Sequence, residues 1–174
     1  MRSGKVDYVY YISQGIAFTS IGDQIMDFCG QGEFVGLVDN SSVKESEFYL
    51  NPLTELTVWR FKKSDVMAKI MSLQDGYLYY YNCMQERYQS YTNRIMLHEE
   101  TDEQRTLIAL HDIGEKFGRY IQSLNRYVIP RTFTRTLVAD YLGISRTKLS
   151  DILSKLKKEG RISLNERRQI TIHK

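Results

Sequence analysis

Apolar and polar positions recur with helical spacing near the end of the chain, in TRTLVADYLGISRTKLSDILSKLKKEG (residues 134–160). The spacing predicts two short helices around a tight turn, because Gly143 can adopt the left-handed backbone that ends a helix. Ser145 follows the turn as a suitable N-cap for the second helix. The apolar residues on one face of that helix are Leu149, Ile152, Leu153 and Leu156.

The first helix of this pair has a matching apolar face, formed by Leu137, Val138, Tyr141 and Leu142. Ala139, four residues before the glycine, is small enough to let the two helix axes cross closely. The residues of the second helix that we expect to point outward are Arg146, Thr147, Ser150 and Asp151. Together these features predict a DNA-reading helix-turn-helix, whose second helix enters the major groove by its N-terminus. An ordinary helical hairpin is the alternative, since paired amphipathic helices are common.

The first sixty residues are rich in the residue types that favour strands. Tyr, Val, Ile and Phe dominate residues 8–21, which predict two strands joined at Gln14-Gly15. Further strands are predicted at residues 24–29, 48–51 and 54–61. Three glycines occur in GQGEFVG (residues 30–36), but no GK[ST] motif follows them. We therefore interpret this segment as tight turns in a small barrel rather than as a phosphate-binding loop.

Helix signals begin at Ser64-Asp65, which we expect to cap the segment VMAKIM, and a longer helix is predicted at about residues 74–98. Its apolar and aromatic positions are separated alternately by four and three residues, the spacing of a coiled-coil seam. These positions are Tyr77, Tyr81, Met84, Tyr88, Tyr91, Ile95 and His98. Lying between a β-rich region and a helix-turn-helix, the seam predicts a parallel homodimer. The same stripe also permits a helix packed against its own β-domain.

A polar break at residues 98–102 is expected to be a hinge, with Thr101 as the N-cap of a helix that runs to about Leu124. The apolar positions of that helix are Leu107, Ile108, Leu110, Ile113, Phe117 and Ile121, and we expect Gly114 and Gly118 to allow close packing. A short extended segment is predicted at 127–129, followed by a break at Pro130. Residues 161–164 and 169–172 alternate with period two and predict a hairpin wing, whose tip carries Arg167 and Arg168. Either arginine could contact a phosphate, and a merely solvated hairpin tip is the equal alternative.

Charge is distributed unevenly along the 174 residues, although the net charge is only +3. From residue 124 onward the chain has 12 Lys/Arg and 4 Asp/Glu, while residues 1–123 have 12 basic and 17 acidic side chains. A basic module beside an acidic remainder is typical of phosphate contact by one module only. No apolar run approaches a membrane span, and YVYYIS is too short and polar for a signal peptide, so we expect a cytoplasmic protein. Cys29 and Cys83 are expected to be buried reduced thiols.

The order of parts resembles the Crp/Fnr superfamily of bacterial transcription regulators, and TRTLVADYLGISRTKLSDIL followed by LKKEGRI is the most specific match. YYISQGIAFTSI and GQGEFVG are similar to the strands of its cyclic-nucleotide domain, and the Tyr- and Phe-rich N-terminal half is more similar to the PrfA-like branch. The resemblance implies an α+β fold, with a partial β-roll and its dimer helix in residues 1–100 and a winged helix-turn-helix in residues 101–174. The roll is expected to be truncated or shortened at its N-terminus, since the family has additional strands there.

The exposed helix end, the hairpin tip and the resemblance together give the residues expected to contact DNA: Thr134, Arg135, Ser145, Arg146, Thr147, Lys148, Ser150 and Arg168. Arg146 is the candidate for a bidentate guanine contact, whereas Thr134 and Arg135 match the family's phosphate-contacting start of the first helix. Thr147 and Asp151 stand where the cyclic-AMP receptor has glutamate and a second base-reading arginine, so a different operator is expected. The expected partners are double-stranded DNA, RNA polymerase and a second copy of the chain, joined through Tyr77, Tyr81, Met84, Tyr88, Tyr91 and Ile95.

No effector can be assigned from the sequence. Cyclic-nucleotide binders have Gly-Glu and a following Arg-Ser or Arg-Thr pair, but here Gly36 precedes Leu37 and SSVKESEF contains no arginine. We therefore do not expect cyclic AMP to be the effector. Two cysteines cannot supply the four thiolates of an Fnr-type iron–sulfur cluster. No catalytic residues are predicted, because His98, His111 and His173 lie in different segments without a nucleophile motif. The alternative to a sequence-specific regulator is a ligand sensor that acts through protein partners and binds DNA weakly.

Overall fold

The computed structural model describes four ranges of the chain, which are residues 8–37, 48–97, 99–165 and 169–173. The chain divides into two compact units, Met1–Ile95 and Met96–Lys174. Each unit has its own buried apolar core. Among the described residues, no helix is both long enough and apolar enough to cross a membrane.

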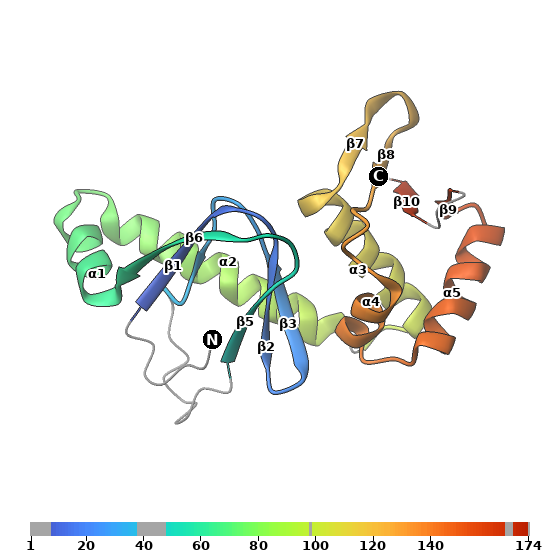
Figure 1. Cartoon of the computed structure of the whole chain (residues 1–174), viewed down its shortest axis with the longest axis horizontal. Helices are drawn as coiled ribbons and strands as arrows, with labels where there is room; N and C mark the ends of the chain where they lie inside the picture. Colours follow the sequence, from blue (N-terminus) through green and yellow to red (C-terminus); the bar gives the residue numbers. More distant parts are fainter. Residues whose placement is uncertain (1–7, 38–47, 98, 166–168, 174) are drawn as a thin grey trace. The chain divides into compact units, whose positions relative to one another are not determined.

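The first unit contains two three-stranded antiparallel sheets (Figure 1). One sheet has the order β4-β1-β6 and consists of β1 (Tyr8–Gln14), β4 (Phe34–Val35) and β6 (Thr57–Lys62). The other has the order β3-β2-β5 and consists of β2 (Ala17–Ile21), β3 (Gln24–Cys29) and β5 (Phe48–Pro52). The predicted β-rich region is therefore confirmed, although the last strand begins at Thr57 rather than at Thr54.

Gly15 lets the chain pass directly from β1 in one sheet to β2 in the other. Its φ of +98° is in the left-handed region, and a Cβ at this position would lie 2.2 Å from the Glu55 carbonyl oxygen. Only glycine fits such a backbone without strain. The buried residues that pack around this turn are Ile12, Ala17, Cys29 and Val35. Cys29 is a buried thiol outside any disulfide, as predicted, and it donates to the Ala17 carbonyl oxygen at 3.6 Å. Cys83 is likewise outside any disulfide, but it is only half-buried.

Helix α1 (Lys63–Ser72) begins earlier than the sequence predicts. Its N-cap position is Lys62, the last residue of β6, and no side chain caps the helix. The prediction that Ser64-Asp65 caps this helix is therefore wrong, because the chain enters the helix directly from the strand. The Ser64 hydroxyl lies 3.2 Å from Asp65 Oδ1 instead of bonding to a backbone N–H group.

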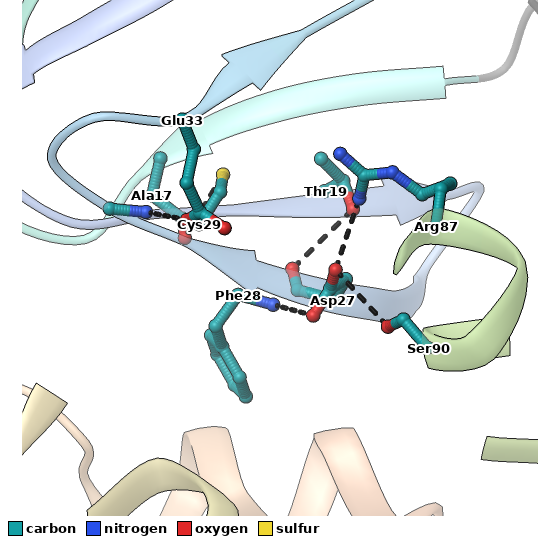
Figure 2. Close-up of polar contacts among 9 residues, drawn as sticks. Ala17, Thr19, Asp27, Phe28, Cys29, Glu33, Arg87 and Ser90 are labelled. Atoms are coloured by element: carbon teal, nitrogen blue, oxygen red, sulfur yellow. Dashed lines mark hydrogen bonds and ion pairs between the residues drawn. The ribbon is translucent and has the colours of Figure 1, made fainter. Parts of the chain in front are cut away.

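One face of the long helix α2 (Gly76–Leu97) is held by its own β-domain. Tyr80 and Cys83 pack against a buried cluster of Val9, Leu37 and Ile70. Further along the same face, Figure 2 shows Arg87 and Ser90 directed at Asp27 of β3. Arg87 Nη1 lies 3.0 Å and Ser90 Oγ 3.4 Å from Asp27 Oδ2, while Asp27 Oδ1 accepts the Phe28 N–H at 2.8 Å.

A second face of α2 carries the predicted seam. The large side chains that are exposed on this helix at the seam positions are Tyr77, Tyr81, Met84, Tyr88 and Ile95. Tyr77 and Tyr88 are 70% and 68% exposed, and Tyr91 is half-buried. His98, the last predicted seam position, lies outside the described residues. The first unit therefore covers the face that contains Cys83 and Arg87 and leaves most of the seam uncovered.

The second unit combines three α-helices with a four-stranded antiparallel sheet of order β7-β8-β10-β9. Its helices are α3 (Asp102–Phe117), α4 (Arg135–Leu142) and α5 (Arg146–Lys158), with a short 3-10 helix η1 (Gln122–Leu124). Its strands are β7 (Arg119–Ile121), β8 (Arg126–Val128), β9 (Ile162–Leu164) and β10 (Ile170–His173). The paired strands β9 and β10 confirm the predicted hairpin wing.

The prediction that a helix runs from Thr101 to about Leu124 is correct at its start and wrong at its end. Thr101 is the N-cap, and its side chain accepts the Gln104 N–H at 3.3 Å. The helix ends at Phe117, because Gly118 turns into extended backbone and the next three residues pair with β8. Glycine is a poor helix former. The backbone groups of residues 119–121 bond to β8 instead of continuing the helix.

Gly114 brings α3 close to the sheet, as predicted. A Cβ at Gly114 would lie 2.9 Å from the Tyr127 Cβ and 3.2 Å from Ile172 Cγ2. The neighbouring positions Ala109, Leu110 and Ile113 are buried, so α3 presents its apolar face to the strands and to the helix pair that follows. Gly118 does not serve close packing of helices, since it ends α3.

Candidate nucleic-acid interface

Helices α4 and α5 are joined by the tight turn that the sequence predicts. Gly143 has φ +66° and ψ +34°, and its N–H bonds back to the end of α4. Thr134 caps α4 by accepting the Leu137 N–H, and Ser145 caps α5 by accepting the Lys148 N–H, both at 3.2 Å. Both helices therefore begin at fixed points, which sets the direction in which α5 leaves the turn.

The underside of α5 is anchored in the core of its own unit. Leu149, Leu153 and Leu156 are at most 1% exposed, and Ile152 beside them is half-buried. The residues of α4 that are buried against them are Val138, Ala139 and Leu142, while Leu137 and Tyr141 are half-buried. Both predicted apolar faces and the small residue at Ala139 are confirmed as a packed helix pair.

The leading end of α5 is free of the core. Arg146, Thr147 and Asp151 are exposed, and Ser150 is half-buried. Ser145 and Thr134 are also exposed, whereas Arg135 is half-buried. Arg168, the remaining predicted contact residue, lies outside the described residues, as does Arg167. The structure therefore brings Ser145, Arg146, Thr147 and Lys148 together on one exposed helix end.

Two lysines of α5 are engaged by acidic residues of α3. Lys148 Nζ forms an ion pair with Asp102 Oδ2, and Lys155 Nζ lies 2.5 Å from Glu103 Oε2. Asp102 also pairs with Arg105 one turn further along α3, and Lys155 Nζ lies 3.9 Å from Glu159 Oε1 of α5 itself. Among the described residues, Arg146 has no carboxylate partner. The first three turns of α5 thus combine two neutralised lysines with an arginine whose charge no described carboxylate compensates.

The ion pairs shift the pKa values of both kinds of partner. The hydrogen bond from Lys148 is the main cause that lowers the pKa of Asp102, and the positive charges of Lys148 and Arg105 lower it further, against a smaller opposing effect of burial. The hydrogen bond and charge of Glu103 raise the pKa of Lys155 above its ordinary value. Asp102 and Lys155 therefore remain charged at neutral pH.

Sequence reasoning missed the two acidic residues that contact α5. In the sequence, Asp102 and Glu103 simply follow the Thr101 N-cap, in the first helical turn where the helix dipole stabilises acidic side chains. Their second role depends on the packing of α3 against α5, which no local spacing encodes. The one available signal was charge complementarity, because an acidic pair and a lysine-rich helix occur in the same unit.

The described residues contain no cluster of three or more His, Cys, Asp and Glu side chains that could hold a metal ion. Asp27, Arg87 and Ser90 form a polar cluster in the first unit, in which Asp27 Oδ2 accepts hydrogen bonds from Arg87 Nη1 and Ser90 Oγ.

Comparison with known proteins agrees with this geometry. Residues 104–174 match the Crp-like helix-turn-helix domain family. No curated protein matches the sequence. Among solved structures, FixK2 from Bradyrhizobium japonicum superimposes with a TM-score of 0.80 at 17% identity, covering 99% of this chain and 86% of that one.

Two further solved structures share the fold over nearly the whole chain. A cyclic nucleotide-binding domain containing protein from Listeria monocytogenes EGD-e has a TM-score of 0.82 at 15% identity, covering 98% of this chain and 82% of that one. A Crp/Fnr-family transcriptional regulator from Thermus thermophilus has a TM-score of 0.72 at 15% identity, covering 99% and 86%. These likenesses confirm the predicted fold, a β-sheet domain with a long helix and a C-terminal helix-turn-helix. Residues 104–174 thus match a Crp-like helix-turn-helix family, and the chain as a whole shares its fold with these solved structures, one of which is a Crp/Fnr-family regulator.

Proposed function

We propose that this protein, which has the helix-turn-helix and the fold of a DNA-binding transcription regulator, binds a near-palindromic operator as a homodimer. The placement of α5 carries the proposal. Its underside is fixed by three buried leucines, while Arg146 and Thr147 at its leading end are exposed. A helix held in this way can insert its N-terminal end into the major groove without disturbing its own core.

The residues divide into two groups by the part of DNA that they contact. Arg146 reads guanine through a bidentate contact to O6 and N7, and Thr147 and Ser150 contact neighbouring base edges. The residues that contact phosphates are Thr134, Arg135, Lys148 and Arg168. Ser145 caps α5 with its hydroxyl, so its contribution to DNA binding is to fix the helix end that Arg146 and Thr147 occupy.

A second copy of the chain supplies the second recognition helix. The seam of α2, which comprises Tyr77, Tyr81, Met84, Tyr88, Tyr91 and Ile95, is the proposed dimer interface. Support comes from the burial pattern, because the β-domain covers a different face of α2 and leaves most seam side chains exposed. The seam spacing is that of a coiled coil, and exposed apolar surface of this extent favours a protein partner.

Finer assignments rest on the sequence resemblance. We place the chain in the PrfA-like branch of the Crp/Fnr superfamily, on the Tyr- and Phe-rich composition of its N-terminal half. A regulator of this kind acts in the cytoplasm, and RNA polymerase is its expected protein partner.

Substitution of Arg146 tests the recognition role. Arg146→Ala is expected to weaken operator binding by about 1–3 kcal/mol while changing binding to unrelated duplex DNA much less. Lys158→Ala removes the same charge from the far, exposed end of α5 and serves as the matched control, for which we expect the ratio of operator to unrelated DNA affinity to stay constant. Fluorescence anisotropy at one salt concentration measures this affinity ratio for each variant and for the wild type. An equal ratio for Arg146→Ala and the wild type would reject the base-reading role of Arg146.

A different result would favour a regulator that acts through protein partners, namely salt-sensitive DNA binding of the wild type without sequence preference.

A further inference from the structure

The acidic residues at the start of α3 lie against the lysines of α5. Asp102 and Glu103 are adjacent in the first turn of α3, and they pair with Lys148 and Lys155 respectively. Lys148 and Lys155 are seven residues apart, or about two helical turns, so both point to the same side of α5. Two consecutive carboxylates of α3 thus form ion pairs with two lysines on one face of α5.

The two acids are less exposed than the lysines that they bind. The Asp102 and Glu103 side chains are partly buried, and Asp102 has a second cation, Arg105, in contact. The ammonium-bearing side chains of Lys148 and Lys155 are more than half exposed. A phosphate can therefore approach either lysine, but it must compete with a carboxylate that is already in place.

This competition affects the two parts of DNA binding differently. Binding to unrelated DNA depends almost entirely on phosphate attraction and on the release of counterions. A lysine paired with a carboxylate contributes less to that attraction, because its charge is already compensated. Arg146 has no carboxylate partner among the described residues, so its attraction to a base edge is not reduced.

Resting on the function proposed above, we infer that Asp102 and Glu103 are specificity-determining residues that suppress sequence-independent DNA binding by neutralising Lys148 and Lys155. They contact neither bases nor phosphates themselves. They act through the two lysines and thereby increase the share of the binding free energy that depends on the base-reading residues Arg146 and Thr147.

The inference is tested with the full-length protein carrying Asp102→Asn and Glu103→Gln. Affinity for a duplex of unrelated sequence is measured by fluorescence anisotropy over a series of salt concentrations. We expect tighter binding by about twofold to fivefold from the release of Lys148, the range of competition from an exposed ion pair. Release of Lys155 should add less, because its Nζ still lies 3.9 Å from Glu159 Oε1. The slope of log affinity against log salt should steepen by up to about 2, since each lysine that contacts a phosphate adds about 0.9.

A double variant with Glu99→Gln and Glu100→Gln is the matched control. It removes the same charge from adjacent, exposed positions that form no ion pair with a described lysine or arginine. General electrostatics alone would give the control the same salt slope as the test variant, and that result would overturn the inference. A test variant with the salt slope of the wild type would also overturn it.

Single lysine substitutions keep the test decisive if the double acidic variant is unstable. Lys155→Gln, made in the otherwise wild-type protein, removes a lysine that is already paired and should change the salt slope little. Lys157→Gln removes an exposed lysine of the same helix and should change the slope more. Equal slope changes for the two variants would contradict the inference. The proposed function fails on a different result, namely the absence of any sequence preference in the wild-type protein.

Discussion

The apolar faces of α5 and α2 have the same kind of helical spacing but opposite surroundings. Leu149, Leu153 and Leu156 of α5 are buried within their own unit, against α4 and the elements around it. Tyr77 and Tyr88 of α2 are more than two-thirds exposed, because the β-domain packs on another face of that helix. Spacing therefore shows which face of a helix is to be covered, but it does not show what covers it.

The difference assigns separate tasks to the two helices. The buried face of α5 makes it a rigid part of the C-terminal unit, whose exposed end is then free for recognition. The exposed face of α2 has no cover from the described residues of its unit, and in the proposed dimer the seam of a second chain covers it. One helix thus contributes to the stability of a single chain, and in the proposed dimer the other contributes to assembly.

The largest expected effect is on the buried face of α5. Leu153→Ala should lower the free energy of unfolding of the C-terminal unit by about 2–5 kcal/mol, because it leaves a cavity in a fully packed site. Denaturant unfolding followed by circular dichroism measures the change. Ser154→Ala, at the exposed neighbouring position, should change stability by less than about 0.5 kcal/mol. A small effect of Leu153→Ala would mean that α5 is not anchored as described.

The next effect concerns the exposed face of α2. Tyr88→Glu should raise the dissociation constant of the dimer by about 30-fold, or about 2 kcal/mol, because it places a charge in the seam. Stability of the single chain should change little, since Tyr88 is exposed there. Sedimentation velocity over a range of protein concentrations measures the dissociation constant.

Asn93→Glu is the control for this substitution, because Asn93 is also exposed on α2 but lies outside the seam positions. It should leave dimerisation close to that of the wild type. If the dimers of the two variants have the same dissociation constant, the exposed face of α2 is not a dimer interface.

The smallest expected effect on stability is at Gly143, in the turn between α4 and α5. Gly143→Ala should destabilise the C-terminal unit by about 1 kcal/mol, because φ is +66° and L residues with a Cβ disfavour that region. Nothing lies within 4 Å of the position that a Cβ would occupy, so the cost comes from the backbone alone. Gly143→Asn is the matched variant, and we expect a smaller loss because asparagine tolerates the left-handed conformation. An equal loss for both variants, measured by thermal unfolding, would contradict this explanation.

The sequence predicted the helix pair well because its signals are local. The turn glycine, the Ser145 cap and the leucine spacing each act within a few residues, and the structure has all three. The end of α3 was predicted wrongly, since the residues after Gly118 form β7 only by pairing with β8. Ser64 was expected to cap α1, but the helix begins directly at the end of β6.

The candidate site was predictable to a similar extent. The exposure of Arg146 and Thr147 follows from helical periodicity, whereas the engagement of Lys148 and Lys155 depends on contacts between residues far apart along the chain. The choice between a dimer helix and a helix packed on its own domain was also open in the sequence. The structure shows that α2 has a separate face for its own domain, around Cys83 and Arg87.

Selection of bound sequences from random duplex DNA by the full-length protein tests the central claim most directly, since it depends on both helices at once. Two recognition helices related by a twofold axis predict an enriched motif of two inverted half-sites whose centres are about one helical turn, or about 34 Å, apart. Recovery of a single half-site without its inverted partner, or of no enriched sequence at all, would contradict the account.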